Sequence, residues 1–157
     1  MTLTNRGKTL AQIVTLINLA GVEIMKIYRG DIQVRQKADS SPVTAADEAA
    51  ERIIIAGLRK LTPNIPGVAE EEVAAGKVVK VSDQPFWLVD PLDGTKEFIA
   101  HRDEFTVNIA LIENFSPTMG VIFAPALHTC YTADGIGTAI KHIAGKTPQS
   151  ITVRQIP

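Results

Sequence analysis

The chain has 157 residues, a formal net charge of −1 and 45% hydrophobic residues. A chain of this length forms one domain that buries about 68–70% of its unfolded surface. The near-neutral charge gives no basic surface for nucleic acid, and 5% aromatic residues are too few for a base-stacking platform. Cys130 is the single cysteine, which excludes an internal disulfide, and we interpret it as a packing residue.

The N-terminal part of the chain is predicted to be a long helix. Between residues 10 and 28 apolar side chains recur at three- and four-residue steps, and Arg29-Gly30-Asp31 ends the pattern. Polar residues interrupt the stretch, so it is typical of an amphipathic helix and not of a membrane span or an export signal. We therefore expect a cytoplasmic protein, with peripheral attachment to the inner membrane left open. Residues 32–43 are predicted to form a loop.

A second helix is predicted over residues 45–61. Thr44 and Asp47 have the spacing of a capping box, in which Asp takes the place of the usual Glu or Gln. Pro63 and Pro66 prevent the helix from continuing. Residues 70–72 are three consecutive glutamates, and residues 73–83 are predicted to be a mobile excursion.

The C-terminal half is predicted to be a series of strands separated by turn residues. Two helices followed by such a series indicate an α+β fold, with helices packed on one face of a largely antiparallel sheet. The predicted strands cover residues 86–90, 106–113, 119–124, 129–133, 138–143 and 151–155.

A pair of carboxylates follows the first of these strands. Asp90 ends an apolar run, Pro91 turns the chain, and Asp93 comes three residues later. Two carboxylates within about 4 Å repel by roughly 4 kcal/mol at an effective dielectric of ~20. A bound cation or a shared proton relieves this repulsion. The cation is the simpler interpretation, since Mg²⁺ prefers carboxylate and carbonyl oxygens, and the Leu92 carbonyl lies between the two acids.

The next two residues are suited to phosphate. Gly94 has no Cβ, so a phosphate can approach the backbone closely, and a helix beginning at Thr95 would point its first N–H groups at that phosphate. The Thr95 hydroxyl, paired with a carboxylate, could orient a metal-bound water for attack on phosphorus. The segment therefore predicts metal-assisted phosphate chemistry.

The same residues carry a family resemblance. The segment from Asp90 to Thr95, Asp-Pro-Leu-Asp-Gly-Thr, resembles the first signature of the inositol monophosphatase superfamily, the lithium-sensitive Mg²⁺ phosphatases. The extension over residues 96–99, the upstream segment 37–47 and the segment 104–110 resemble the bacterial 3′(2′),5′-bisphosphate nucleotidases. The resemblance implies the N-terminal half of the layered sugar-phosphatase fold. It also implies Mg²⁺-dependent removal of the 3′-phosphate from adenosine 3′,5′-bisphosphate in sulfate assimilation.

Residue roles are carried over from the resemblance position by position. Asp47 and Thr95 would act together on the nucleophilic water. The complete family site would hold two or three Mg²⁺ ions, and the substrate phosphate would lie against overlapping residues. The implied metal ligands are Glu70, Glu71, Asp90, the Leu92 carbonyl and Asp93; the implied substrate-binding residues are Glu70, Leu92, Asp93, Gly94 and Thr95.

The chain departs from the family in one respect. The family's second signature, Trp-Asp-x-Ala-Ala, supplies a further metal ligand, whereas the single tryptophan here, Trp87, belongs to the first signature. We therefore expect residues 1–157 to form a single N-terminal phosphatase domain without the family's C-terminal domain. Fewer ions would then bind, and the uncovered surface would favour association.

Two alternatives stay open. One is a non-catalytic remnant that binds metal or nucleotide, or an interaction module. The other is an inositol-phosphate phosphatase, which Lys96 and Glu97 make a poorer match. A small phosphate ester, not a nucleic-acid polymer, is the expected partner. His101, His128 and His142 share no ligand spacing and are not assigned to the metal.

Overall fold

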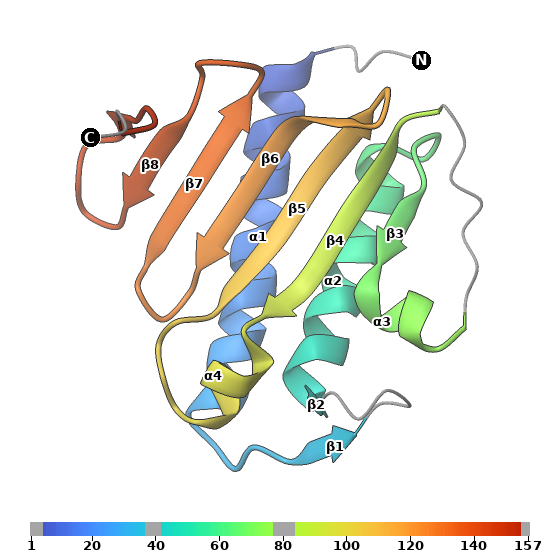
Figure 1. The fold of residues 1–157 in the computed structure, drawn as a ribbon, viewed down its shortest axis with the longest axis vertical. Helices are drawn as coiled ribbons and strands as arrows, with labels where there is room; N and C mark the ends of the chain where they lie inside the picture. Colours follow the sequence, from blue (N-terminus) through green and yellow to red (C-terminus); the bar gives the residue numbers. More distant parts are fainter. Residues whose placement is uncertain (1–4, 37–41, 77–83, 155–157) are drawn as a thin grey trace.

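Two long helices lie against one face of a twisted sheet in the computed structural model, which describes residues 5–36, 42–76 and 84–154. Figure 1 shows the sheet in front of these helices. The helices are α1 Arg6–Tyr28, α2 Ala45–Leu61, α3 Glu70–Ala74 and α4 Thr95–Ile99. The strands are β1 Val34–Gln36, β2 Pro42–Thr44, β3 Gly67–Ala69, β4 Phe86–Asp93, β5 Thr106–Glu113, β6 Ser116–Ala124, β7 Thr129–Asp134, β8 Ile140–Ile143 and β9 Gln149–Ser150.

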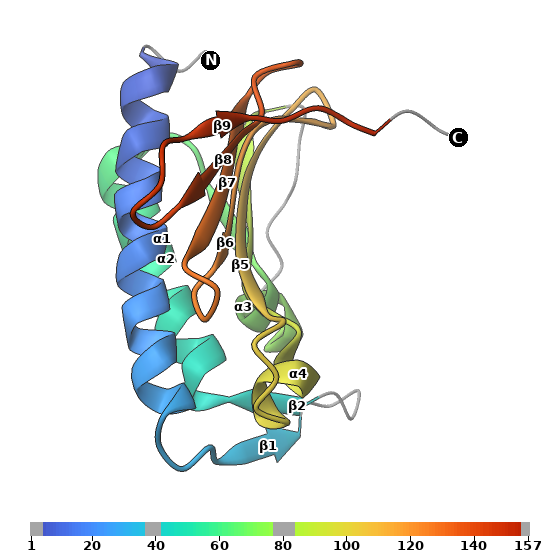
Figure 2. The same cartoon turned by 90° about the vertical axis from the view of Figure 1, so that its left-hand side faces the viewer.

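The seven-stranded sheet has the order β3-β4-β5-β6-β7-β8-β9 among the described residues. β3 and β4 are parallel, and every other neighbouring pair is antiparallel. Figure 2 shows α1 and α2 on one side of this sheet, with α3 and α4 at its lower end. The predicted α+β fold, with helices on a largely antiparallel sheet, is therefore confirmed.

The two long helices form as their sequences predict. α1 is capped by Asn5, whose side chain accepts a hydrogen bond from the Lys8 N–H, and α2 begins with the predicted Thr44–Asp47 capping box. Among the described helices only α1 is long and apolar enough to span a membrane. Its apolar face packs instead on the core through buried residues: Ile13, Leu16, Ile17, Ala20, Gly21, Ile24 and Tyr28.

Some local predictions are wrong. Residues 32–43 were expected to be a loop but contain β1 and β2, a short antiparallel pair. The last strand was expected at 151–155, whereas β9 is Gln149–Ser150, residues 151–154 lie outside any strand and residue 155 lies outside the described part. The antiparallel pairing reaches the start of β8 at Ser150, so the Ile151 N–H donates to Ala139, which precedes that strand, and later residues have no position of β8 opposite them.

The region before β4 also differs from expectation. β3 was not predicted, and neither was α3, which begins with the three glutamates. Of the predicted excursion, residues 73 and 74 are helical, while residues 77–83 lie outside the described residues. β4 continues to Asp93, three residues beyond the predicted end.

An aromatic cluster fixes α4 to the body of the domain. The ring of Phe98 lies 5.2 Å from that of Tyr28 and 5.1 Å from that of Phe105, measured between centroids. The Tyr28 hydroxyl donates to Asp103 at 2.9 Å, just beyond α4. Tyr28 at the end of α1 and Phe105 just before β5 thus hold α4, which carries Thr95.

Replacing Phe98 by Ala should lower the free energy of unfolding by about 3–5 kcal/mol, since Phe98 is fully buried. Phe115→Ala is the matched control, because this side chain is 75% exposed, and a change within about 0.5 kcal/mol is expected. Urea unfolding measures both. Equal effects of the two substitutions would contradict the packing role of Phe98.

Candidate functional site

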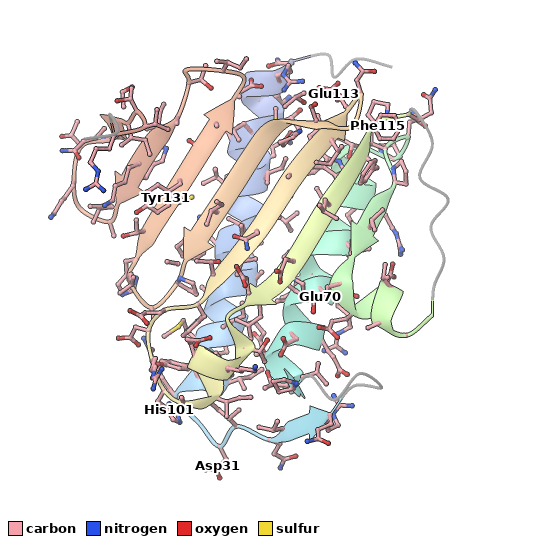
Figure 3. All side chains as sticks on the ribbon, in the orientation of Figure 1. Asp31, Glu70, His101, Glu113, Phe115 and Tyr131 are labelled. Carbon is pink, nitrogen blue, oxygen red and sulfur yellow. The ribbon has the colours of Figure 1, made fainter. Side chains whose placement is uncertain are left out.

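The parallel pairing of β3 and β4 brings two acids together. Ala69 is the register partner of Val89, so Glu70, which follows β3, lies beside Asp90 of β4 near the same end of the sheet. Figure 3 shows Glu70 beside the end of β4. A side-chain hydrogen bond links Glu70 and Asp90. The adjacency depends on β3, which the apolar pattern of the sequence did not indicate.

A bulge in β4 brings the third acid to the same face. Asp90 pairs with Asn108 and Asp93 pairs with Thr106, so the two residues between the acids in β4 stand opposite a single residue of β5. Without the extra residue Asp90 and Asp93 would point to opposite faces, because side chains alternate along a strand. With it they share a face, and the Asn108 side-chain amide donates to Asp93 Oδ2 at 3.3 Å.

Asp90 is the most perturbed carboxylate at this edge. Burial, the charges of Glu70 and Asp93, and the hydrogen bond with Glu70 raise its pKa from 3.8 to about 7. The Leu92 N–H donates to Asp90 Oδ1 at 3.2 Å and opposes this shift. Folding therefore holds three acids close enough that Asp90 retains a proton near neutral pH.

A second pair of functional groups lies where α2 and α4 begin. Asp47 is 1% exposed, and its Oδ2 accepts the Thr44 N–H and hydroxyl, both at 2.7 Å. Its Oδ1 lies 3.2 Å from the Thr95 hydroxyl. Burial raises the pKa of Asp47, while its hydrogen bonds with Thr44 and Thr95 lower it. The capping box thus fixes one oxygen of Asp47 and directs the other towards Thr95.

Gly94 is required by its surroundings. Its φ is +89°, which favours glycine, and a Cβ there would lie 2.9 Å from the Glu104 carbonyl oxygen. The turn lets the chain pass from β4 directly into α4, whose first residue is Thr95.

Leu92 connects the two groups. Its carbonyl oxygen lies 3.1 Å from the Thr95 hydroxyl, and the residue sits in the bulge between Asp90 and Asp93. The contacts therefore bring together Glu70, Asp90 and Asp93 on one side and Asp47 and Thr95 on the other. The Glu71 N–H donates to Glu51, and the negative charge of Glu71 helps to raise the pKa of Glu51. Over the described residues, no group of three His, Cys, Asp or Glu side chains already has the arrangement to hold an ion.

Glu51 is a buried acid that the sequence reading missed. Its two oxygens accept the N–H groups of Glu71 at 2.7 Å and Glu72 at 3.0 Å. Burial raises the pKa of Glu51, and these N–H groups oppose the shift. The available signal was its position four residues after Asp47, on the same face of a predicted helix.

The predicted packing role of Cys130 fits its position. The thiol is buried beside the core, and burial raises its pKa to about 11, so it is not primed as a nucleophile.

The chain resembles curated bacterial nucleotidases. It is 51% identical over 126 residues to the 3′(2′),5′-bisphosphate nucleotidase CysQ of Escherichia coli K12, covering 79% of this chain and 51% of the relative. Identity to the Buchnera aphidicola protein of the same name is 45% over 128 residues, which cover 80% of this chain and 48% of the relative. The chain thus spans about half the length of the curated relatives it matches.

A solved structure shares both the fold and substantial sequence. CysQ from Bacteroides thetaiotaomicron, described as a bacterial member of the inositol monophosphatase family, superposes with a TM-score of 0.69 at 36% identity. The match covers 92% of this chain and 53% of that chain. The profile described as the Inositol monophosphatase family matches residues 6–155. The chain belongs to the inositol monophosphatase family.

Proposed function

We propose that this chain supplies the nucleophile-activating half and part of the metal site of an Mg²⁺-dependent phosphomonoesterase. The proposal rests on one observation: Glu70, Asp90 and Asp93 converge at the same edge of the sheet as the Asp47–Thr95 pair. The residue types fit magnesium, since every side chain in the group offers oxygen. A divalent cation bound between these acids would relieve the repulsion by Glu70 and Asp93 that helps to raise the pKa of Asp90.

The residues that would hold Mg²⁺ are Glu70, Asp90, Asp93 and the Leu92 carbonyl. Glu71 is a further candidate ligand, and its backbone N–H donates to Glu51. When bound, Mg²⁺ acidifies a coordinated water and stabilises charge on the phosphoryl oxygens. The number of ions stays a prediction from the family resemblance.

Asp47 and Thr95 would orient and deprotonate the attacking water. When the Thr95 hydroxyl donates to Asp47, its oxygen is free to accept a hydrogen bond from water. As the water proton moves to the Thr95 oxygen, the Thr95 proton moves to Asp47 Oδ1, whose raised pKa favours accepting it. Thr44 keeps Asp47 in place during the transfer.

The phosphate would lie over the turn from β4 into α4. The backbone N–H groups of Gly94 and Thr95 are its proposed donors, and Glu70, Leu92 and Asp93 are the other proposed substrate-binding residues. The proposed substrate is adenosine 3′,5′-bisphosphate, supported by the nucleotidase names of relatives at 45–51% identity. We further propose a cytoplasmic location, since the apolar face of α1 is buried against the core.

A metal- or nucleotide-binding module without turnover is the second candidate. It is supported by the share of the curated nucleotidases that the chain matches, about half of their length. Inositol phosphate as substrate is supported by the likeness to an inositol monophosphatase from Thermotoga maritima, at 29% identity and a TM-score of 0.73.

Asp90→Asn should stabilise the metal-free chain at alkaline pH. The Asp90 pKa of about 7 exceeds its ordinary 3.8, so between these values the folded chain binds more protons than the unfolded chain. The free energy of unfolding should therefore fall as pH rises through this window, by at most ~1.4 kcal/mol per pH unit. Urea unfolding in EDTA from pH 5 to pH 8 should show this fall in the wild type and a flatter profile in the variant.

The same substitution should weaken magnesium binding, because it removes a charged ligand from the proposed site. Calorimetric titration with Mg²⁺ at pH 8 measures this effect, and Asp31→Asn, an exposed acid near α1, is the control. Wild-type affinity in Asp90→Asn would remove Asp90 from the metal site and overturn the proposed function.

Thr95→Val should slow phosphate release from adenosine 3′,5′-bisphosphate by about 10²–10⁴-fold, the usual contribution of a positioned proton acceptor. Thr95→Ser keeps the hydroxyl and should retain most of the rate. Colorimetric phosphate release with Mg²⁺ measures both. Equal rates in the Val and Ser variants would exclude the Asp47–Thr95 pair from the reaction.

The open face of the sheet is the proposed association surface, with a second copy of this chain as its partner. Small residues on adjacent strands, Ala110 and Gly120, form the floor of a groove of about 420 Å³. Leu88 and Ile122 border it, with 48% and 46% of their surface exposed. Exposed apolar area of this kind favours association.

Ile122→Glu should therefore shift the chain towards monomer in sedimentation velocity. Leu19→Glu is the control, since Leu19 is 57% exposed on α1, away from this face. A wild-type chain that is monomeric at high micromolar concentration would contradict the proposed association.

A further inference from the structure

Glu51 joins α2 to α3 through two hydrogen bonds that end beside the proposed metal site. Its Oε2 accepts the Glu71 N–H at 2.7 Å and its Oε1 accepts the Glu72 N–H at 3.0 Å. The carboxylate is 6% exposed. A buried carboxylate with two N–H donors is a strong and directional contact, because charged hydrogen bonds are shorter and stronger than neutral ones.

Hydrophobic burial contributes little to the position of α3. The helix has five residues, none of them buried, and Ala69 at its N-cap provides no side-chain acceptor. Arg59 reaches Glu72 at 3.6 Å, but its own side chain is 65% exposed. Hydrophobic burial therefore does not set the orientation of α3, and the Glu51 carboxylate supplies the acceptor that the N-cap lacks.

Glu70 is the first residue of α3 and precedes the two N–H groups that Glu51 holds. Its side chain meets Asp90 at the edge of the sheet. A rotation of α3 about the end of β3 would carry Glu70 away from Asp90, because β3 fixes only the residues up to Ala69. The two bonds from Glu51 oppose that rotation.

We propose that Glu51 is a positioning residue, which orients α3 so that Glu70 faces Asp90 and Asp93 in a form able to bind a divalent cation. This inference rests on the proposed function. α2 then has two roles, carried by residues one helical turn apart. Asp47 belongs to the water-activating pair, and Glu51 positions the metal ligand Glu70. Partners behind metal ligands commonly change metal affinity by about 10–100-fold when they are removed.

Glu51→Gln tests the hydrogen bonds with little change of shape. The amide keeps one acceptor oxygen and turns an NH₂ group towards the other backbone N–H. We expect Mg²⁺ affinity to fall at least about tenfold in calorimetry. We also expect the Glu71 and Glu72 amides to exchange with solvent about tenfold faster, as measured by NMR in the absence of metal. Glu48→Gln is the matched control on the same helix, because Glu48 is exposed and pairs with Arg35.

Glu51→Asp separates geometry from charge. Asp keeps the negative charge but is one methylene shorter, so it cannot reach both N–H groups, and we expect its Mg²⁺ affinity to fall as in the Gln variant. Affinity restored to the wild-type value in Glu51→Asp would mean that charge alone matters and would overturn the positioning role. Both variants are compared at a temperature where circular dichroism shows them folded.

Asp90→Asn distinguishes the two levels of the proposal. Weak Mg²⁺ binding in Asp90→Asn together with wild-type binding in Glu51→Gln would overturn the role of Glu51 and leave the proposed function standing. Wild-type binding in Asp90→Asn would overturn the proposed function and, with it, this inference. A loss of thermal stability in Glu51→Gln without any change in Mg²⁺ affinity would show a role in folding only and would also overturn it.

Discussion

Repulsion among acids at the end of β4 is the constraint on which the rest of the structure depends. Three carboxylates converge there, and burial together with the charges of Glu70 and Asp93 raises the pKa of Asp90 to about 7. Such an arrangement lowers stability unless a cation is present, and the surrounding fold must supply the compensation. The stabilisation comes from the buried aromatic cluster that packs against α4 and from the α1–α2 layer.

α2 organises this edge from behind. Its first turn contains the Thr44–Asp47 capping box, in which Asp47 both closes the helix and faces Thr95. One turn later Glu51 reaches the start of α3. The helix terminus and the site therefore share the same atoms, so that the stability of α2 and the geometry of Asp47 are coupled.

The sequence predicts the main elements and part of the site for identifiable reasons. Helical periodicity and the Thr44–Asp47 spacing are local signals, and both α2 and its capping box were predicted correctly. β3 escaped prediction because three residues show no period, and its parallel pairing with β4 is a contact between distant segments. Glu51 escaped for a related reason: its partners are backbone N–H groups, which no side-chain motif marks. The roles of the site residues stay predictions.

The bulge in β4 explains why the two aspartates of this motif stand three residues apart. In an unbroken strand, acids on a common face must be separated by an even number of positions. An odd separation works here because the Pro91–Leu92 step adds one residue against β5. The parity of the spacing is thus tied to an irregularity in the strand. Regular pairing of the same sequence, without the bulge, would turn one acid towards the hydrophobic interior, whereas deleting one residue between the acids would give an unbroken strand with both acids on one face.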